Sequence, residues 1–172
     1  MCSSEKYFFL EVLQEKINTS EKNTPVCLVL VNPVVINTET VLYDMKDLIQ
    51  KLATSLISQN DGVCYRISED KFGIIISKKN SFQVHDIALN FCKQFKKDNN
   101  YRSFKKDCNA INIGITCTVS NKVDATTLFT QAKNALSRSI IYKEKRVICH
   151  KDIVFMNSKP GIKKEKYHFH IN

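Results

Sequence analysis

The chain has 172 residues and a formal net charge of +9 at pH 7, with 43% hydrophobic and 25% charged residues. This length suits one domain built around one core, and 4 glycines and 3 prolines are too few for a low-complexity chain. The longest apolar runs, such as residues 26–31, are strand-sized and too short to span a membrane. The first six residues carry no basic segment followed by an apolar one, so we expect a cytoplasmic protein without a secretion signal.

The seven cysteines are an odd number and include no C-x-x-C pair, which favours reduced thiols in a reducing compartment. They are Cys2, Cys27, Cys64, Cys92, Cys108, Cys117 and Cys149. His168 and His170 come nearest to a zinc-binding spacing, but we expect no bound metal. The basic balance could attract nucleic acid or an anionic surface. Because the lysines alternate with asparagines and acids, we interpret it as an ordinary solvated surface, and nucleic acid is not an expected partner.

The spacing of apolar residues predicts helices where they recur every three or four residues, and strands where they alternate or run together. The first strand should be central in the sheet and end or bulge at Asn32-Pro33, because proline cannot donate to a ladder. A hairpin with its turn at Glu69-Asp70 joins two short strands, and Asp124 can cap the last helix. The predicted order α-β-α-β-β-α-β-α-β has helices over residues 7–17, 38–57, 84–95 and 124–136, and strands over residues 26–36, 63–67, 72–76, 111–119 and 147–149.

We expect one folded domain over residues 1–150 and a basic C-terminal extension over residues 151–172 that is partly ordered. The extension contains Pro160-Gly161, which favours either a short extra hairpin or a loose tail. Phenylalanines at helical spacing are expected to pack in the core and not to stack on bases. They are Phe8, Phe9, Phe82, Phe91, Phe95 and Phe129.

Four segments carry a resemblance to a known family. Residues 9–13 follow the pattern F-x-x-x-L ahead of a strand, and residues 66–72 read Arg-Ile-Ser-Glu-Asp-Lys-Phe, close to R-x-G-G-D/E-E-F. Residues 112–115 are similar to an S-x-G strand, with Asn112 for the serine. Residues 128–136 are similar to L-x-x-A-D-x-A-L, with Lys133 for the aspartate. In this order the segments resemble GGDEF domains, the catalytic domains of diguanylate cyclases.

The resemblance covers residues from about 7 to 150 and implies an α/β sandwich. The implied fold is the palm-like fold of GGDEF domains and class III nucleotide cyclases, in which helices flank a central, mostly antiparallel sheet. A different ferredoxin-like α/β domain is the alternative.

The resemblance also implies where metal and nucleotide would bind, and there this chain departs from the pattern. The family's acidic positions on the first strand fall at Val29 and Val31, and aliphatic side chains cannot bind Mg²⁺. Ser68 and Glu69 replace the paired glycines, which adds bulk and negative charge beside the phosphates. Asp70 keeps the position of a metal-binding acid. The degenerate motif is Ser68, Glu69, Asp70, Lys71 and Phe72, with Lys71 in place of a glutamate.

Few residues remain as nucleotide-binding candidates, and none is assigned to catalysis or to a metal. Asn37 matches the family's guanine-reading asparagine, and Asp44 or Asp47 could stand near its guanine-reading aspartate. Asp70 is a further candidate. A phosphate-holding lysine of the family is replaced by Ile140. The basic residues that could substitute, or be ordinary surface charges, are Arg138, Lys143 and Arg146.

These departures predict a catalytically inactive GGDEF-like module of bacterial cyclic di-GMP signalling, regulatory in role and without a cofactor. Its expected partners are another protein or a second copy on the hairpin face, or GTP or another nucleotide. Two alternatives stay open. One is a weakly active diguanylate cyclase or related nucleotide phosphotransferase that uses Mg²⁺ and GTP. The other is a binder of nucleic acid or anionic surfaces through the basic tail.

Overall fold

The computed structural model describes residues 3–36, 41–58, 61–106, 108–119, 121 and 123–152. The C-terminal extension from residue 153 onward, and with it the expected hairpin or tail, lies outside these residues. The helices in the described part are α1 (Ser3–Thr19), α2 (Val41–Leu56), α3 (Ser81–Lys97) and α4 (Ala125–Ile141), with short 3₁₀ turns at Asn99–Tyr101 and Phe104–Lys106. The strands are β1 (Val26–Val35), β2 (Gly62–Ser68), β3 (Lys71–Ser77), β4 (Cys108–Thr118) and β5 (Val147–Cys149).

The strands of the described chain form one five-stranded sheet in the order β2-β3-β1-β4-β5. Strand β1 pairs antiparallel with β3 and β4, β2 and β3 form the predicted hairpin, and β5 runs parallel to β4. The predicted element order and the central place of the first strand are confirmed. The strand continues through Pro33, which is tolerated because pairing with β3 has ended at Val31; the register with β4 shifts between Val34 and Val35.

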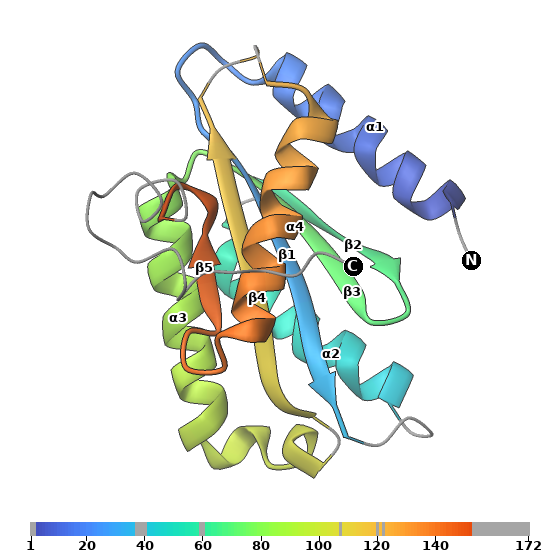
Figure 1. The fold of residues 1–172 in the computed structure, drawn as a ribbon, viewed down its shortest axis with the longest axis vertical. Helices are drawn as coiled ribbons and strands as arrows, with labels where there is room; N and C mark the ends of the chain where they lie inside the picture. Colours follow the sequence, from blue (N-terminus) through green and yellow to red (C-terminus); the bar gives the residue numbers. More distant parts are fainter. Residues whose placement is uncertain are drawn as a thin grey trace.

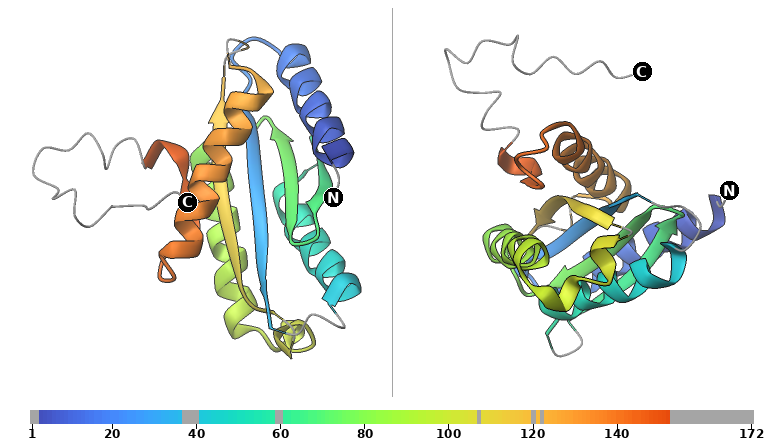
Figure 2. Two further views of the ribbon diagram at one scale, coloured as in Figure 1. Left: turned by 45° about the vertical axis from the view of Figure 1, so that its right-hand side comes forward. Right: turned by 90° about the horizontal axis from the view of Figure 1, so that it is seen from below.

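Helices α2 and α3 cover one face of the sheet, and α1 and α4 cover the other (Figures 1 and 2). In Figure 1, α4 crosses in front of the sheet. Because β1 is central and covered on both faces, all its residues from Val26 to Val31 are buried. Burial on both faces explains why this strand is continuously apolar instead of alternating.

Side chains of Asn80 and Asp124 cap the N-termini of α3 and α4. Asn80 accepts a hydrogen bond from the Gln83 backbone N–H, and the Gln83 side chain accepts one from the Asn80 backbone N–H, which is a capping box. Asp124 accepts from the backbone N–H of Thr127 at 2.6 Å, as expected for the cap of α4. The cap at Asn80 fixes where α3 starts after β3.

The expectation that all the phenylalanines pack in the core is wrong for Phe8 and Phe82, which are 54% and 72% exposed. Consecutive helix residues point about 100° apart, so Phe8 turns outward when its neighbour Phe9 is fully buried. Phe82 stands two residues before the buried Val84, about 200° around α3. The spacing of apolar residues located these helices correctly, but it did not identify which of their residues face the core.

The expectation of reduced cysteines is wrong for one pair, because Cys27 and Cys117 form a disulfide between β1 and β4. The two residues lie 90 positions apart in the sequence, so no short motif indicates the pairing. The antiparallel register brings them directly opposite each other. The free cysteines in the described part are Cys64, Cys92, Cys108 and Cys149. Among the described helices, none combines the length and apolar character that crossing a membrane requires.

Candidate functional site

The turn of the β2–β3 hairpin consists of Ser68, Glu69, Asp70 and Lys71. The register shifts between Arg66 and Ser68, so Ser68 pairs with Lys71 and the other two residues make the turn. Arg66 closes the turn, because its Nε donates to the Ser68 carbonyl oxygen at 3.1 Å and its Nη2 to the Glu69 carbonyl oxygen at 2.9 Å. None of the four turn residues has a positive φ, so this backbone does not require glycine.

Three side chains among the described residues hold the carboxylate of Asp70. Lys71 Nζ donates to Oδ1 at 2.9 Å and to Oδ2 at 3.0 Å, and Ser68 Oγ donates to Oδ1 at 2.9 Å. Asn32, on the neighbouring strand β1, donates from Nδ2 to Oδ2 at 3.2 Å and to the Asp70 carbonyl oxygen at 3.0 Å. Both carboxylate oxygens therefore face donors already, and an adjacent ammonium balances their charge.

A row of polar side chains continues across the sheet from this turn. Asn32 lies opposite Asn112 in the register of β1 and β4, and Asn112 is almost fully buried. Arg146, directly before β5, donates from Nη1 to Asn112 Oδ1 at 2.8 Å. The Arg146 Nε is buried and has no hydrogen-bond partner among the described residues. The row thus runs from the Asp70 carboxylate, whose charge Lys71 balances, to the Arg146 guanidinium, whose Nε–H group has no partner among the described residues.

A family model described as "Diguanylate cyclase, GGDEF domain" matches residues 39–145, which is more than half of the chain. The chain belongs to the GGDEF domain family. A search of curated proteins finds no significant match.

Solved structures with the same fold include several GGDEF domains. The GGDEF domain of DgcB from Caulobacter crescentus, solved with c-di-GMP, has a TM-score of 0.65 at 14% identity, covering 85% of this chain and 90% of its own. The FimX GGDEF domain from Pseudomonas aeruginosa has a TM-score of 0.61 at 12% identity, covering 84% and 92%. The diguanylate cyclase SiaD of Pseudomonas aeruginosa, solved with its activator SiaC, has a TM-score of 0.57 at 12% identity, covering 84% and 56%. These likenesses show the palm-like GGDEF fold expected from the sequence.

The expected acidic positions of the GGDEF first strand are core positions in this chain. Val29 and Val31 are fully buried in the larger core beneath α2 and α3, and Phe72 is buried in the same core. Glu69 is exposed on the turn. Asn37 and the side chain of Asp44 lie outside the part that the structure describes. Within that part, no group of three or more His, Cys, Asp or Glu side chains could hold a metal ion.

Sequence reasoning did not assign Asn32 or Asn112 to the GGDEF site, although the structure joins both to the hairpin row. In the sequence, Asn32 stands out only as an interruption beside Pro33, and Asn112 only as the replacement of a serine. The available signal was a lone amide within each of two otherwise apolar strands, which predicts a buried polar contact. Of the three basic residues considered for phosphates, the structure brings Arg146 into the row.

The surroundings of Asp70 in the turn shift the pKa of its carboxyl, which a titration can measure. Partial burial raises the pKa of the Asp70 carboxyl, but hydrogen bonds from Lys71 and Ser68 and the Lys71 charge outweigh this effect, so the pKa lies below its ordinary value of 3.8. A native pKa below the unfolded one means that this group stabilises the fold above about pH 4 and ceases to do so as the pH falls through the native pKa.

We expect Lys71→Gln to raise the pKa of Asp70, because the substitution removes the ammonium that stabilises the ionised carboxyl. The measurement is an NMR titration of the Asp70 carboxyl carbon. Lys78→Gln is the matched control, since it removes the same charge from a lysine that pairs with Asp61 at 3.2 Å. Equal Asp70 pKa values in the wild type and Lys71→Gln would contradict the role given to Lys71.

Proposed function

We propose that this chain is a catalytically inactive GGDEF module that regulates by binding a protein partner or a nucleotide. The observation that carries the proposal is the ion pair of the hairpin turn, in which Lys71 Nζ lies 2.9 Å from Asp70 Oδ1. Joining two GTP molecules into cyclic di-GMP depends on divalent metals that carboxylates hold. An ammonium beside the carboxylate at the metal-binding position opposes a divalent cation there.

The substituted glycine positions support the same proposal. Ser68 and Glu69 carry side chains where the family's glycines let a triphosphate approach the backbone. Glu69 is exposed on the turn, so its carboxylate meets any approaching phosphate with like charge. Loss of metal ligands and loss of close phosphate contact together remove most of the electrostatic stabilisation that phosphoryl transfer needs.

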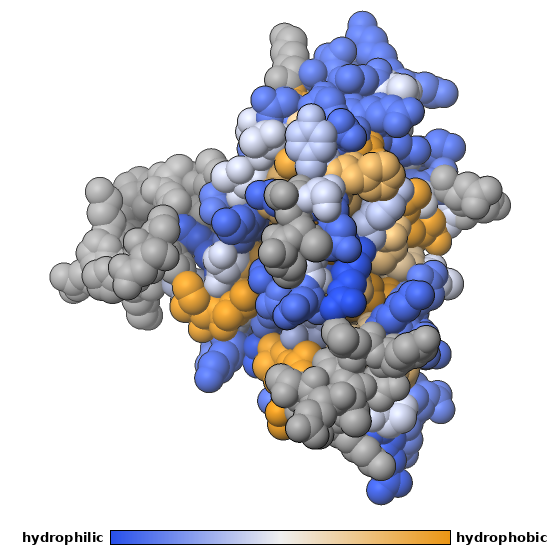
Figure 3. Space-filling model, turned by 90° about the vertical axis from the view of Figure 1, so that its right-hand side faces the viewer, coloured by the Kyte–Doolittle hydropathy of each residue, from blue (hydrophilic) through white to orange (hydrophobic). Residues whose placement is uncertain are grey.

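Exposed apolar side chains near the hairpin favour a protein partner or a second copy. Tyr7 and Phe8 on α1 and Val63 on β2 are 66%, 54% and 39% exposed, and Phe8 contacts Tyr65 of β2 edge-on at 5.8 Å between ring centroids. Figure 3 views this side of the molecule, where apolar side chains reach the surface among polar ones. Large apolar groups gathered at one face are typical of interaction surfaces.

The polar row favours the nucleotide version of the proposal. Arg146 is half-buried, its Nε has no partner among the described residues, and no carboxylate in that part of the chain pairs with it. An unpaired guanidinium N–H group suits an anionic group such as a phosphate.

The test is a calorimetric titration of the purified protein with GTP and Mg²⁺, followed by an assay of the same samples for cyclic di-GMP. We expect no product. Heat of binding without product identifies a nucleotide-responsive regulator, and no heat identifies a module that works through a protein partner. The matched variant is Asp70→Ala. Product that disappears in Asp70→Ala would overturn the proposal in favour of a residual cyclase, whereas product unchanged by it would come from a contaminant.

A further inference from the structure

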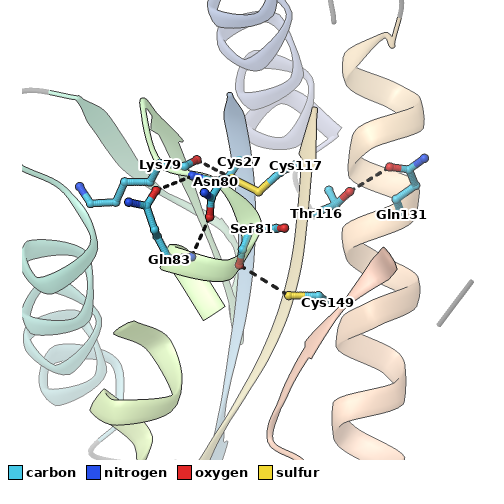
Figure 4. The surroundings of a disulfide bond; sticks show 9 residues. All are labelled: Cys27, Lys79, Asn80, Ser81, Gln83, Thr116, Cys117, Gln131 and Cys149. Atoms are coloured by element: carbon cyan, nitrogen blue, oxygen red, sulfur yellow. Dashed lines mark hydrogen bonds between the residues drawn. A yellow bond between two sulfur atoms is a disulfide. The ribbon is translucent and has the colours of Figure 1, made fainter. Parts of the chain in front are cut away.

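The disulfide joins two neighbouring strands of the sheet at positions that face each other. Cys27 on β1 and Cys117 on β4 are partners in the antiparallel register, with Cα atoms 4.0 Å apart (Figure 4). The strands are held by their own ladder on both sides of the pair, from Val26 to Val34. The two sulfur atoms therefore stay neighbours whether or not a bond joins them.

The structure also offers a place for the reduced thiol of Cys27. Its Sγ lies 3.1 Å from the carbonyl oxygen of Lys79, which is the residue before the N-cap of α3 (Figure 4). In the disulfide this sulfur carries no proton, but after reduction its S–H group can donate to that oxygen. Both redox states of Cys27 are thus accommodated without moving β1 or the start of α3.

The two cysteine residues differ in exposure. Cys27 is fully buried, whereas Cys117 is half-buried and lines a cavity of about 390 Å³ beside the N-terminus of α3. The residues that line the cavity include Lys151 and no acidic side chain, and Asp152, next along the chain, lies near enough to raise the pKa of Cys149. The other lining residues are Ser81, Ile115, Thr116, Gln131, Cys149 and His150.

The remaining thiols in the described part of the chain are poor competitors. Burial raises the pKa of Cys64 and Cys108 to about 11, and the pKa of Cys92 and Cys149 to about 12. At neutral pH these side chains are almost entirely protonated, and the thiol form does not attack a disulfide. Cys149 lines the same cavity but is held as a thiol in this way.

We propose that Cys27 and Cys117 form a reversible thiol–disulfide site that low-molecular-weight thiols, such as glutathione, open through the cavity at Cys117. A glutathione thiolate attacks Cys117 Sγ, the bond between the two cysteine sulfurs breaks, and its electron pair passes to Cys27 Sγ, which takes a proton from solvent. A second glutathione thiolate attacks the glutathione sulfur of the mixed disulfide and releases Cys117 as a thiol after protonation. Glutathione disulfide is the product, and the same disulfide is the oxidant of the reverse reaction.

The redox state should change stability strongly because the bond closes a long loop. Cross-linking residues 90 positions apart constrains the unfolded chain far more than the folded one. For a chain of this size we expect Tm to fall by roughly 10 °C on reduction and to recover on reoxidation.

The test is equilibration of the native protein in buffers that span ratios of reduced to oxidised glutathione, followed by acid quench, alkylation and mass spectrometry. We expect Cys27 and Cys117 to become alkylated together in one transition, with Tm falling in the same samples. A bond that stays closed until denaturant unfolds the protein would overturn the proposal, because the disulfide would then be a permanent cross-link. Two thiols that persist in pure glutathione disulfide would overturn it as well.

Two serine variants test whether the redox dependence of Tm comes from the bond between Cys27 and Cys117. Cys117→Ser should abolish the redox dependence of Tm, while Cys64→Ser, which removes a free and partly buried thiol, should keep it. A redox-dependent Tm that survives in Cys117→Ser would place the transition at other cysteines and overturn the proposal.

Discussion

The double variant Asn32→Asp, Lys71→Glu is expected to bind Mg²⁺ about 100-fold more tightly than the wild type. It replaces the ammonium that occupies both Asp70 oxygens and turns the amide that contacts Asp70 Oδ2 into a carboxylate. At about 4 Å in water, each unit of charge changes the energy of a divalent ion by about 2 kcal/mol before screening. Screening by salt and repulsion among the new carboxylates reduce the gain in Mg²⁺ binding free energy to about 3 kcal/mol. Calorimetric titration with Mg²⁺ alone measures the affinity of the variant and of the wild type.

The charge-matched control for this variant is Asn134→Asp, Lys133→Glu on the exposed side of α4. It changes the net charge equally but adds no ligand beside Asp70, so we expect less than a threefold change in Mg²⁺ affinity from long-range attraction. Similar affinities of the two double variants would contradict the proposal that Lys71 and Asn32 disfavour a divalent metal at Asp70.

Gly114→Ala is expected to lower the free energy of unfolding by about 3 kcal/mol, because no space exists for the added methyl group. A Cβ at Gly114 would collide with the backbone N of Leu136 and the backbone O of Ala132, both on α4. Helix backbone cannot move aside without lifting α4 from β4. Urea unfolding followed by circular dichroism measures the change.

Gly73→Ala is the matched control, since it adds the same methyl group to the neighbouring part of the sheet. There the nearest atoms are the tips of side chains, Phe9 Cζ at 2.5 Å and Ile67 Cδ1 at 2.6 Å, which can shift. We expect a loss of about 1 kcal/mol. A loss for Gly114→Ala no larger than for Gly73→Ala would contradict the close approach of α4 to β4.

The element order, the hairpin and the central strand could be predicted because each depends on local patterns of apolar and turn residues. The role of Gly114 shows the limit of that reasoning. The Ile-Gly-Ile pattern contributed to the resemblance to GGDEF domains. The glycine is needed because α4, from a later part of the chain, packs directly on Gly114. The pairing of Cys27 with Cys117 likewise depends on register between strands far apart in sequence.

The candidate site was predicted in part. The hairpin that carries residues 68–72 could be located from its spacing, and Val29 and Val31, where the family resemblance places acids, are buried in the core. The loss of a metal site at these positions stays a prediction. The partners of Asp70 could not be predicted, because Asn32 and Lys71 reach it only once β1 and β3 are in register and the turn has formed. Asn37 and Asp44 stay predictions.

A cyclic di-GMP assay on wild-type protein incubated with Mg²⁺ and GTP decides whether this GGDEF module is catalytically inactive. A diguanylate cyclase of known activity serves as the positive control, and Asp70→Ala as the matched variant. We expect no product from the wild type, with or without heat of nucleotide binding. Product that forms in the wild type and is lost in Asp70→Ala would contradict it, because Asp70 would then hold a working metal despite its ion pair with Lys71.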